Sequence, residues 1–172
     1  MIIGTKELVK MGLFAALALA LGFSLVHIPN VELVTLTIFF SGSILGRLKG
    51  ALVGMVAMVL FTLFNPLGPA VIPVAIAQVI GMGLVGMAGG IMGSRIKEIK
   101  TALARGAFLA GWGFSLSLLY DLLTNLAVAA AFGLWERWYA VVIGGLTFSL
   151  IHIVSNTVIF ALIGGTLIRR WA

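Results

Sequence analysis

The stretch IPVAIAQVIGMGLVGMAGGIMGSRIKEIK, residues 72–100, decides the fold class of this chain. Its first 23 residues, 72–94, contain no charged side chain, and the next six contain three basic residues. A helix needs about 20 apolar residues to cross roughly 30 Å of hydrocarbon, and positive residues gather beside spans on the cytoplasmic side. The stretch therefore predicts a membrane-spanning helix that ends at a basic cytoplasmic loop.

The composition of the whole chain is that of a protein whose solvent is lipid. Of its 172 residues, 62% are hydrophobic and only 9% are charged, whereas a soluble domain usually has about a quarter of its residues charged. Twenty-two glycines fit this interpretation, because membrane helices tolerate glycine and pack through small residues. The absence of cysteine excludes disulfides, thiolate catalysis and cysteine metal sites. We expect a single membrane domain over residues 1–172, with no cleaved signal peptide at its start.

Five further apolar segments surround the quoted stretch. The break before it is NPLGPAVIP (65–73), in which three prolines and a glycine stop a helix. Other breaks are GRLKG (46–50), a glycine-flanked turn between two short segments, and GLWERW (133–138). The sequence thus predicts an all-α integral membrane protein with six transmembrane helices. The expected spans are 8–27, 33–47, 50–65, 72–94, 105–132 and 139–168.

The basic residues are distributed very unevenly between the two ends of these spans. One end has Lys6, Lys10, Arg47, Lys49, Arg95, Lys97, Lys100, Arg105, Arg169 and Arg170. The other end has only Arg137. Because cytoplasmic loops carry the excess of Lys and Arg, this asymmetry predicts that both termini are cytoplasmic. The loops HIPNVE (27–32), NPLGPAVIP (65–73) and GLWERW (133–138) are then predicted to face outward. The uneven distribution of Lys and Arg also explains the net charge of +6 as an orientation signal, and it argues against nucleic acid as a partner.

Polar side chains inside the predicted spans are few and lie toward the outer end. Asp121 and Asn125 are four residues apart and share a helix face, as do His152 and Asn156 on the next span. Gln78 lies near the outer end of the fourth span. Asp at a helix centre costs about 2.5–3.5 kcal/mol on insertion scales, and no Lys or Arg lies at the depth of Asp121. We therefore expect Asp121 to be protonated or to face water or a ligand, with His152 as a candidate hydrogen-bond partner.

These groups and the outer loops are candidates for one ligand cavity, because small-molecule sites combine apolar walls with a few placed polar groups. The candidate substrate-binding residues are Asn30, Glu32, Gln78, Asp121, Asn125, Trp135, Trp138, Tyr139, His152 and Asn156. Two alternatives stay open. The intramembrane polar groups would only hydrogen-bond one another, and the aromatic residues would form a belt at the membrane interface.

The first predicted span has a face of small residues. In KMGLFAALALALG (10–22), Gly12, Ala16 and Ala20 follow one another at intervals of four, and Ala15 is expected to add to the same surface. Such faces let helices approach closely in lipid. The face is predicted either to pack within this chain's own bundle or to dock a separate membrane subunit.

With these features the whole chain resembles the substrate-binding S components of energy-coupling factor (ECF) vitamin transporters. The resemblance rests on six spans with both ends inside and on AALALA (15–20) in the first span. It also rests on PNVELVTLTIFFSGSILGRLKGALVGMVA (29–57), which contains the pattern LGRLKGALVG (45–54), and on the proline-containing loop before the fourth span.

The resemblance implies binding rather than catalysis. The chain would capture a vitamin or vitamin-like molecule outside a prokaryotic cell and would work in the cytoplasmic membrane with a transmembrane coupling subunit and two cytoplasmic ATPases. Ala16 and Ala20 would contact the coupling subunit, and loops 27–32 and 65–73 would act as lids. Nickel and cobalt members ligate their metal through a histidine at position two, where this chain has Ile2, so no metal is expected. The identity of the vitamin stays open.

Two other functions fit parts of the sequence. A stand-alone membrane carrier or structural membrane subunit would share the spans but need no ATPase partner. A rhomboid-like intramembrane serine protease would pair Ser115 with His152, although Leu116 replaces the second glycine of the G-x-S-G pattern. No G-x-x-x-x-G-K-[ST] signature occurs, so ATP hydrolysis would belong to partner chains. We predict a protein that is not an enzyme and that needs no cofactor.

Overall fold

The computed structural model describes residues 3–164 and residue 166, and its regular elements are all helical. The α-helices are α1 (Thr5–Leu25), α2 (Val34–Leu45), α3 (Arg47–Leu63), α4 (Ile72–Glu98), α5 (Ala102–Ala131) and α6 (Trp138–Ile159). A 3₁₀ turn, η1 (Trp135–Arg137), precedes α6, and a π-helical turn, η2 (Phe160–Gly164), follows it. The predicted all-α fold is confirmed. Residues 165, 167 and 168 of the sixth predicted span lie outside the described residues, as do Arg169 and Arg170, two of the arginines predicted to be cytoplasmic.

The helices differ in whether they are long enough to cross a bilayer. α1, α4, α5 and the stretch Trp135–Gly164 are each long and apolar enough by length and composition. α2 has only 12 residues, so at 1.5 Å per residue it extends about 18 Å, short of a hydrocarbon core of roughly 30 Å. The expected second span, 33–47, is therefore shorter in the structure than a full crossing.

The connection between α2 and α3 corrects the sequence-based prediction of a five-residue turn over 46–50. Only Gly46 separates the two helices, and Arg47 already begins α3. Gly46 has a φ of 90°, a left-handed conformation that a residue with a Cβ atom rarely adopts. Lys49 consequently lies in the first turn of α3, where it forms an ion pair with Glu7 of α1.

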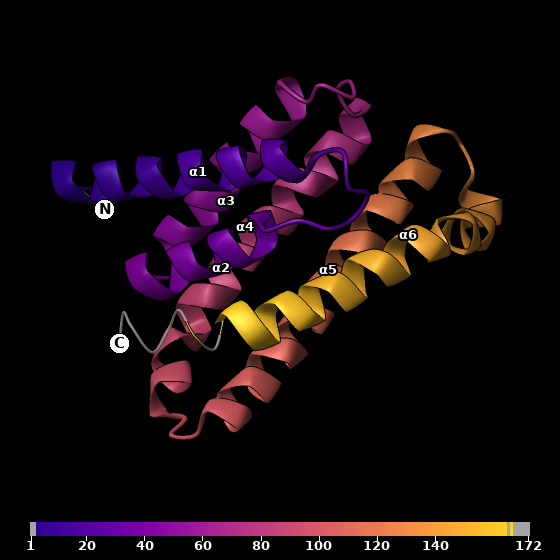
Figure 1. Cartoon of the computed structure of the whole chain (residues 1–172). Coiled ribbons are helices and arrows are strands. Elements are labelled where there is room, and N and C mark those ends of the chain that lie inside the picture. The colour runs from indigo at the N-terminus through magenta and orange to yellow at the C-terminus, as the bar shows by residue number, and fades with distance from the viewer. Residues whose placement is uncertain (1–2, 165, 167–172) are drawn as a thin grey trace.

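The connections gather at two ends of the bundle (Figure 1). The α1–α2 connection, the α3–α4 connection and η1 lie toward one end. The start of α1, the turn at Gly46 and the α4–α5 connection lie toward the opposite end. The three loops that the distribution of Lys and Arg assigns to the outside thus share one end of the molecule.

Helices α2, α3 and α4 pack backbone against backbone. A Cβ atom added to Gly86 of α4 would lie 2.0 Å from the carbonyl oxygen of Gly50 in α3, and one added to Gly42 of α2 would lie 1.9 Å from that of Gly86. At Gly89 it would lie 1.9 Å from the carbonyl oxygen of Phe39. No side chain fits at such distances, so glycine alone permits this close approach in a membrane bundle. We call Gly42, Gly50, Gly86 and Gly89 the glycine seam.

Helices α5 and α6 form a hairpin that packs against the other helices. A Cβ atom on Gly113 of α5 would lie 2.7 Å from the backbone oxygen of Asn156, so the two helices also approach closely. The ring of Tyr120 covers Gly81 of α4, where an added Cβ atom would lie 2.7 Å from Cδ2 of that ring. Through these contacts, α5 and α6 bring their polar residues toward the connection between α1 and α2.

Candidate functional site

A cavity of about 510 Å³ opens at the end of the bundle that holds the α1–α2 and α3–α4 connections. This volume is in the range of small-molecule sites. All six helices and both connections contribute to its lining. The lining residues are Gly22, Leu25, Val26, Ile28, Pro29, Asn30, Val31, Glu32, Val34, Met58, Phe61, Asn65, Leu67, Gln78, Met82, Tyr120, Asp121, Thr124, Asn125, Gly145, Phe148, Ser149 and His152.

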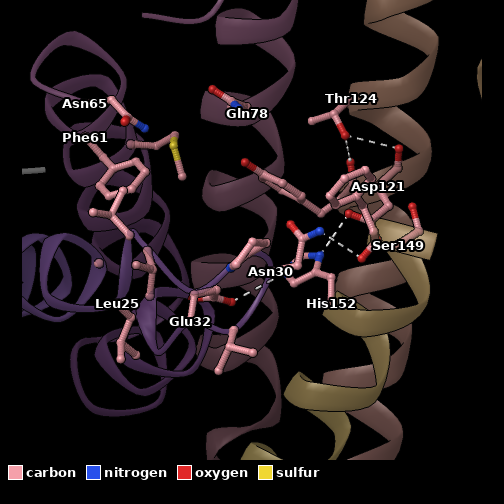
Figure 2. A pocket seen from close by; sticks show the side chains of 18 of the residues that line it. Leu25, Asn30, Glu32, Phe61, Asn65, Gln78, Asp121, Thr124, Ser149 and His152 are labelled. Atoms are coloured by element: carbon pink, nitrogen blue, oxygen red, sulfur yellow. Dashed lines mark hydrogen bonds and ion pairs between the residues drawn. The ribbon is translucent and has the colours of Figure 1, made fainter. Parts of the chain in front are cut away.

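A buried histidine lies between two carboxylates in this lining. Nδ1 of His152 is 2.8 Å from Oδ1 of Asp121, and its Nε2 is 3.5 Å from Oε1 of Glu32. The side chain of His152 is 7% exposed, that of Asp121 14% and that of Glu32 20%. Figure 2 shows His152 next to Asp121 on one side and to Glu32 on the other. The predicted contact between Asp121 and His152 therefore exists, and Glu32 of the α1–α2 connection extends it.

Glu32 connects three elements. Its Oε1 accepts a hydrogen bond of 2.8 Å from Nδ2 of Asn156 in α6, and its Oε2 accepts one of 2.8 Å from the backbone N–H of Thr35 in the first turn of α2. Burial raises the pKa of the Glu32 carboxyl, but His152 and the hydrogen bonds from Thr35 and Asn156 lower it by more, so its pKa lies below the ordinary value. An ionised Glu32 thus caps α2 and attaches the loop to α6.

Asn30 anchors the same loop a second time. Its Nδ2 donates a 3.0 Å hydrogen bond to the backbone oxygen of Phe148, and its own backbone oxygen accepts one of 2.8 Å from Oγ of Ser155. Both partners belong to α6. Asn30 has a φ of 58°, a left-handed conformation that asparagine tolerates better than most residues. The α1–α2 connection is therefore held over the cavity by hydrogen bonds from two neighbouring positions.

The opposite wall of the cavity is mostly apolar. The ring of Phe61 stacks on Phe23 with centroids 5.1 Å apart. On the wall that holds His152, the ring of Tyr120 meets the imidazole edge to face at 5.8 Å. Gln78 of α4 accepts a hydrogen bond of 3.1 Å from Thr62 of α3, which fixes its amide oxygen. The amide nitrogen of Gln78 makes no hydrogen bond within the described part of the chain.

Some buried polar atoms near the cavity have no hydrogen-bond partner among the described residues. Within the polar cluster these are Oδ2 of Asp121 and Oδ1 of Asn156. A buried acceptor without a donor is unfavourable by about 1–3 kcal/mol. Asp121 lines the cavity, whereas Asn156 lies behind Glu32 and is fully buried. Asp121 therefore contributes its side chain to the cavity lining, while its Oδ2 lies beneath that surface without a donor among the described residues.

The structure brings together six of the ten sequence-predicted site residues. The residues that line the cavity as expected are Asn30, Glu32, Gln78, Asp121, Asn125 and His152. Asn156 supports the site through Glu32 rather than lining it. Trp135, Trp138 and Tyr139 are about half exposed and do not belong to the described lining.

Several lining residues were missed by the sequence analysis. They include Phe61, Thr124, Phe148 and Ser149. Asn65 lines the cavity as part of the predicted lid loop 65–73, although it was not among the candidate binding residues. Phe61 and Phe148 gave no usable signal, since an aromatic residue in an apolar span has the same pattern whether it faces lipid or a cavity.

The geometry does not form a serine–histidine dyad. Ser115 is exposed, and its Oγ donates to the backbone oxygen of Gly111 at 2.8 Å. Both ring nitrogens of His152 instead face carboxylates. No hydrogen bond joins Ser115 to His152 in the described part of the chain, so the protease interpretation loses its catalytic pair. Within the described ranges, no group of three or more His, Cys, Asp or Glu is placed to hold a metal ion.

The small-residue face on α1 is uncovered in the isolated chain. Gly12, Ala16 and Ala20 are exposed, and a Cβ atom on Gly12 would have no neighbour within 4 Å. Ala15, which was expected to extend this face, is 8% exposed and packs into the core together with the fully buried Ala18. That expectation is wrong, because residues 15 and 18 point about a third of a turn or more away from the 12–16–20 line.

A comparison with known protein families supplies the next observation. The family described as "ECF transporter, substrate-specific component" matches residues 6–164, which is nearly the whole chain. Searches of curated proteins and of solved structures give no match to this chain.

Proposed function

The chain belongs to the family of substrate-specific components of ECF transporters, and from this premise we propose that it captures a vitamin or vitamin-like molecule for uptake into the cell. Membership of this family makes it a multi-pass integral membrane protein with a role in substrate binding. The observation that carries the finer proposal is the cavity of about 510 Å³, whose lining combines apolar walls with polar groups from two loops and from α4, α5 and α6.

We assign the capture of the molecule to the polar residues of that lining. Asp121, Asn125 and His152 form its wall on the α5–α6 side, and Gln78 presents its amide from α4. Loops 27–32 and 65–73 act as lids, which is supported by the presence of residues from both loops in the lining. Asn30 and Glu32 hold the first lid to α6 through the hydrogen bonds described above.

The first test is the identity of the small molecule that co-purifies with the protein. Isothermal titration should then give a dissociation constant for the wild type and for Asn125→Ala, which removes an amide from the lining. We expect a loss of about 1–3 kcal/mol, or roughly 5- to 150-fold. Trp138→Phe, outside the described lining, serves as the control and should bind like the wild type. Equal losses in both variants, or no bound molecule at all, would refute the assignment of this cavity.

We further propose that the Gly12, Ala16 and Ala20 face docks a transmembrane coupling subunit, through which two cytoplasmic ATPases energise uptake across the cytoplasmic membrane of a prokaryote. The exposure of these three positions supports this, because no part of the described chain covers them. Lipid supplies no hydrophobic driving force for helix association, so membrane helices associate through close packing. Three small residues in line permit that close approach.

Ala16→Leu is expected to prevent assembly with the coupling subunit and to leave ligand binding unchanged. The added side chain separates the helix backbones at the docking face, whereas this face lies outside the cavity lining. Co-purification with a tagged coupling subunit measures assembly, and titration of the isolated protein measures binding. Ala107→Leu, at an exposed position of α5, is the matched control. Intact assembly in Ala16→Leu would remove the docking role from this face.

A further inference from the structure

The lining of the cavity is acidic. Its ionisable side chains are Glu32, Asp121, His152 and Tyr120, and none of the described residues that line it is Lys or Arg. A protonated His152 balances one carboxylate only. When both carboxylates are ionised, the lining therefore carries a net negative charge, and a ligand of the same sign would be repelled at short range.

His152 is not free to receive an anion. Its Nδ1 lies 2.8 Å from Asp121 Oδ1 and its Nε2 lies 3.5 Å from Glu32 Oε1, so both ring nitrogens are directed at carboxylates. A ligand carboxylate or phosphate that approached this ring would also approach both acidic side chains. The remaining polar groups of the lining are amides and hydroxyls, which bear no charge to compensate.

The two carboxylates differ in the acceptor capacity that they have left. Glu32 uses one oxygen for Asn156 and the other for the backbone of Thr35. Asp121 uses Oδ1 for His152, whereas its Oδ2 has no partner in the described structure although it is buried. Because Oδ2 lies beneath the lining, a ligand donor reaches this acceptor only when the Asp121 side chain turns toward the cavity. An ionised donor would then form the stronger, charge-assisted bond.

The walls of the cavity suit a flat ring. Phe61, Tyr120 and Phe148 line the cavity with Met58 and Met82. Aromatic faces stack on planar heterocycles, and their negative faces attract cations. The thioethers adapt to irregular shapes. The lining therefore offers apolar stacking surfaces together with a net negative charge.

We propose that this cavity takes a small organic cation, a flat ring system bearing a positively charged N–H group that pairs with Asp121, and that it rejects carboxylates and phosphates. This rests on the proposed function and narrows the class of its substrate. The negative charge of the lining favours a positively charged ligand, and the apolar walls favour a flat one. Asp121 is the carboxylate of the lining that has unused acceptor capacity.

Benzamidine, benzamide and benzoate provide the test, because they have nearly the same size and shape but positive, zero and negative charge. Each is titrated against the purified, full-length protein in nanodiscs, and dissociation constants are measured by ligand-observed NMR. We expect benzamidine to bind tighter than benzoate by roughly tenfold or more, with benzamide between them. In Asp121→Asn this preference should fall to roughly threefold or less, because the amide carries no charge. Glu136→Gln, which neutralises an acidic residue of η1 outside the lining, should keep the full preference.

Benzoate binding as tightly as benzamidine, or an absence of benzamidine binding, would overturn the assignment in the wild type without any variant. A preference that persists in a folded Asp121→Asn protein would overturn the role of Asp121. The proposed function fails in a different way. If the molecule that co-purifies is an acid, the proposed function holds and only the proposal of a cationic ligand is refuted. If no small molecule is bound at all, the proposed function and the cationic ligand are both refuted.

Discussion

Replacing Glu32 with alanine is expected to release the α1–α2 loop from α6 and to destabilise the protein. In the structure the Glu32 carboxylate accepts hydrogen bonds of 2.8 Å from Asn156 and from the backbone of Thr35. Asn156 is fully buried, and its Oδ1 already lacks a partner among the described residues. Without Glu32 the entire Asn156 amide would be unpaired in apolar surroundings.

The magnitude follows from these contacts. Leaving a buried amide donor unsatisfied costs about 1–3 kcal/mol, and removing the side-chain acceptor from the first turn of a helix costs about 1 kcal/mol. The expected loss for Glu32→Ala is therefore about 2–4 kcal/mol in the free energy of unfolding. Asn156→Leu replaces the amide with an apolar group of similar size, so Glu32→Ala should cost about 1–2 kcal/mol less in that background.

The assay is equilibrium unfolding of the purified protein in mixed micelles with increasing dodecyl sulfate, followed by helical circular dichroism, for the wild type, both single variants and the double variant. Glu136→Ala is the control, because this acidic residue is exposed in η1 and should change stability by less than about 0.5 kcal/mol. Strictly additive losses for the two substitutions, or a loss for Glu32→Ala no larger than the control, would refute the attribution of loop anchoring to this pair.

Two further predictions concern packing and topology. Gly86→Ala should destabilise the bundle by about 3 kcal/mol or more, because its Cβ atom would lie 2.0 Å from the Gly50 carbonyl oxygen and only a backbone shift can relieve the overlap. Gly111→Ala, which meets nothing within 4 Å, should be neutral or stabilising by up to about 1 kcal/mol in the same unfolding titration. Because the native chain has no cysteine, a single introduced cysteine reports its own accessibility. In intact cells, a cysteine at Glu98 should be protected from a membrane-impermeant thiol reagent, whereas one at Leu134 should be labelled. Labelling at 98 would reverse the predicted orientation.

The sequence was most informative where chemistry and helical periodicity agree. Asp121 and His152 were recognisable because ionisable groups are costly inside a membrane span and because no cation lies at their depth. The helix order followed from apolar segments separated by proline, glycine and charge. The exact bounds did not, since Gly46 ends one helix and begins the next through its own backbone conformation, and the surrounding GRLKG looks like an ordinary turn.

The rest of the site depends on tertiary packing, which local sequence patterns do not reveal. That Glu32 contacts Asn156, 124 positions later, depends on how the α1–α2 loop lies against α6. Trp135, Trp138 and Tyr139 had the composition of a binding cluster and of an interfacial belt alike, and in the structure they lie outside the described lining. Ala15 and Ala16 are adjacent in sequence, yet one is buried and the other exposed, because successive helical residues point 100° apart.

The glycine seam determines which parts of the protein can deform. Interfaces built from side chains yield by changing rotamers, but the contacts of Gly42, Gly50, Gly86 and Gly89 join backbone to backbone and have no rotamer to change. α2, α3 and α4 should therefore respond to force as one stiff plate. The more compliant parts should be the loops and the α5–α6 hairpin, which packs on α4 and α2 through side chains such as Tyr120 over Gly81 and Trp112 beside Phe39. A force applied at α1 would consequently tilt the plate as a unit, whereas the cavity would widen by movement of the hairpin and the loops away from it.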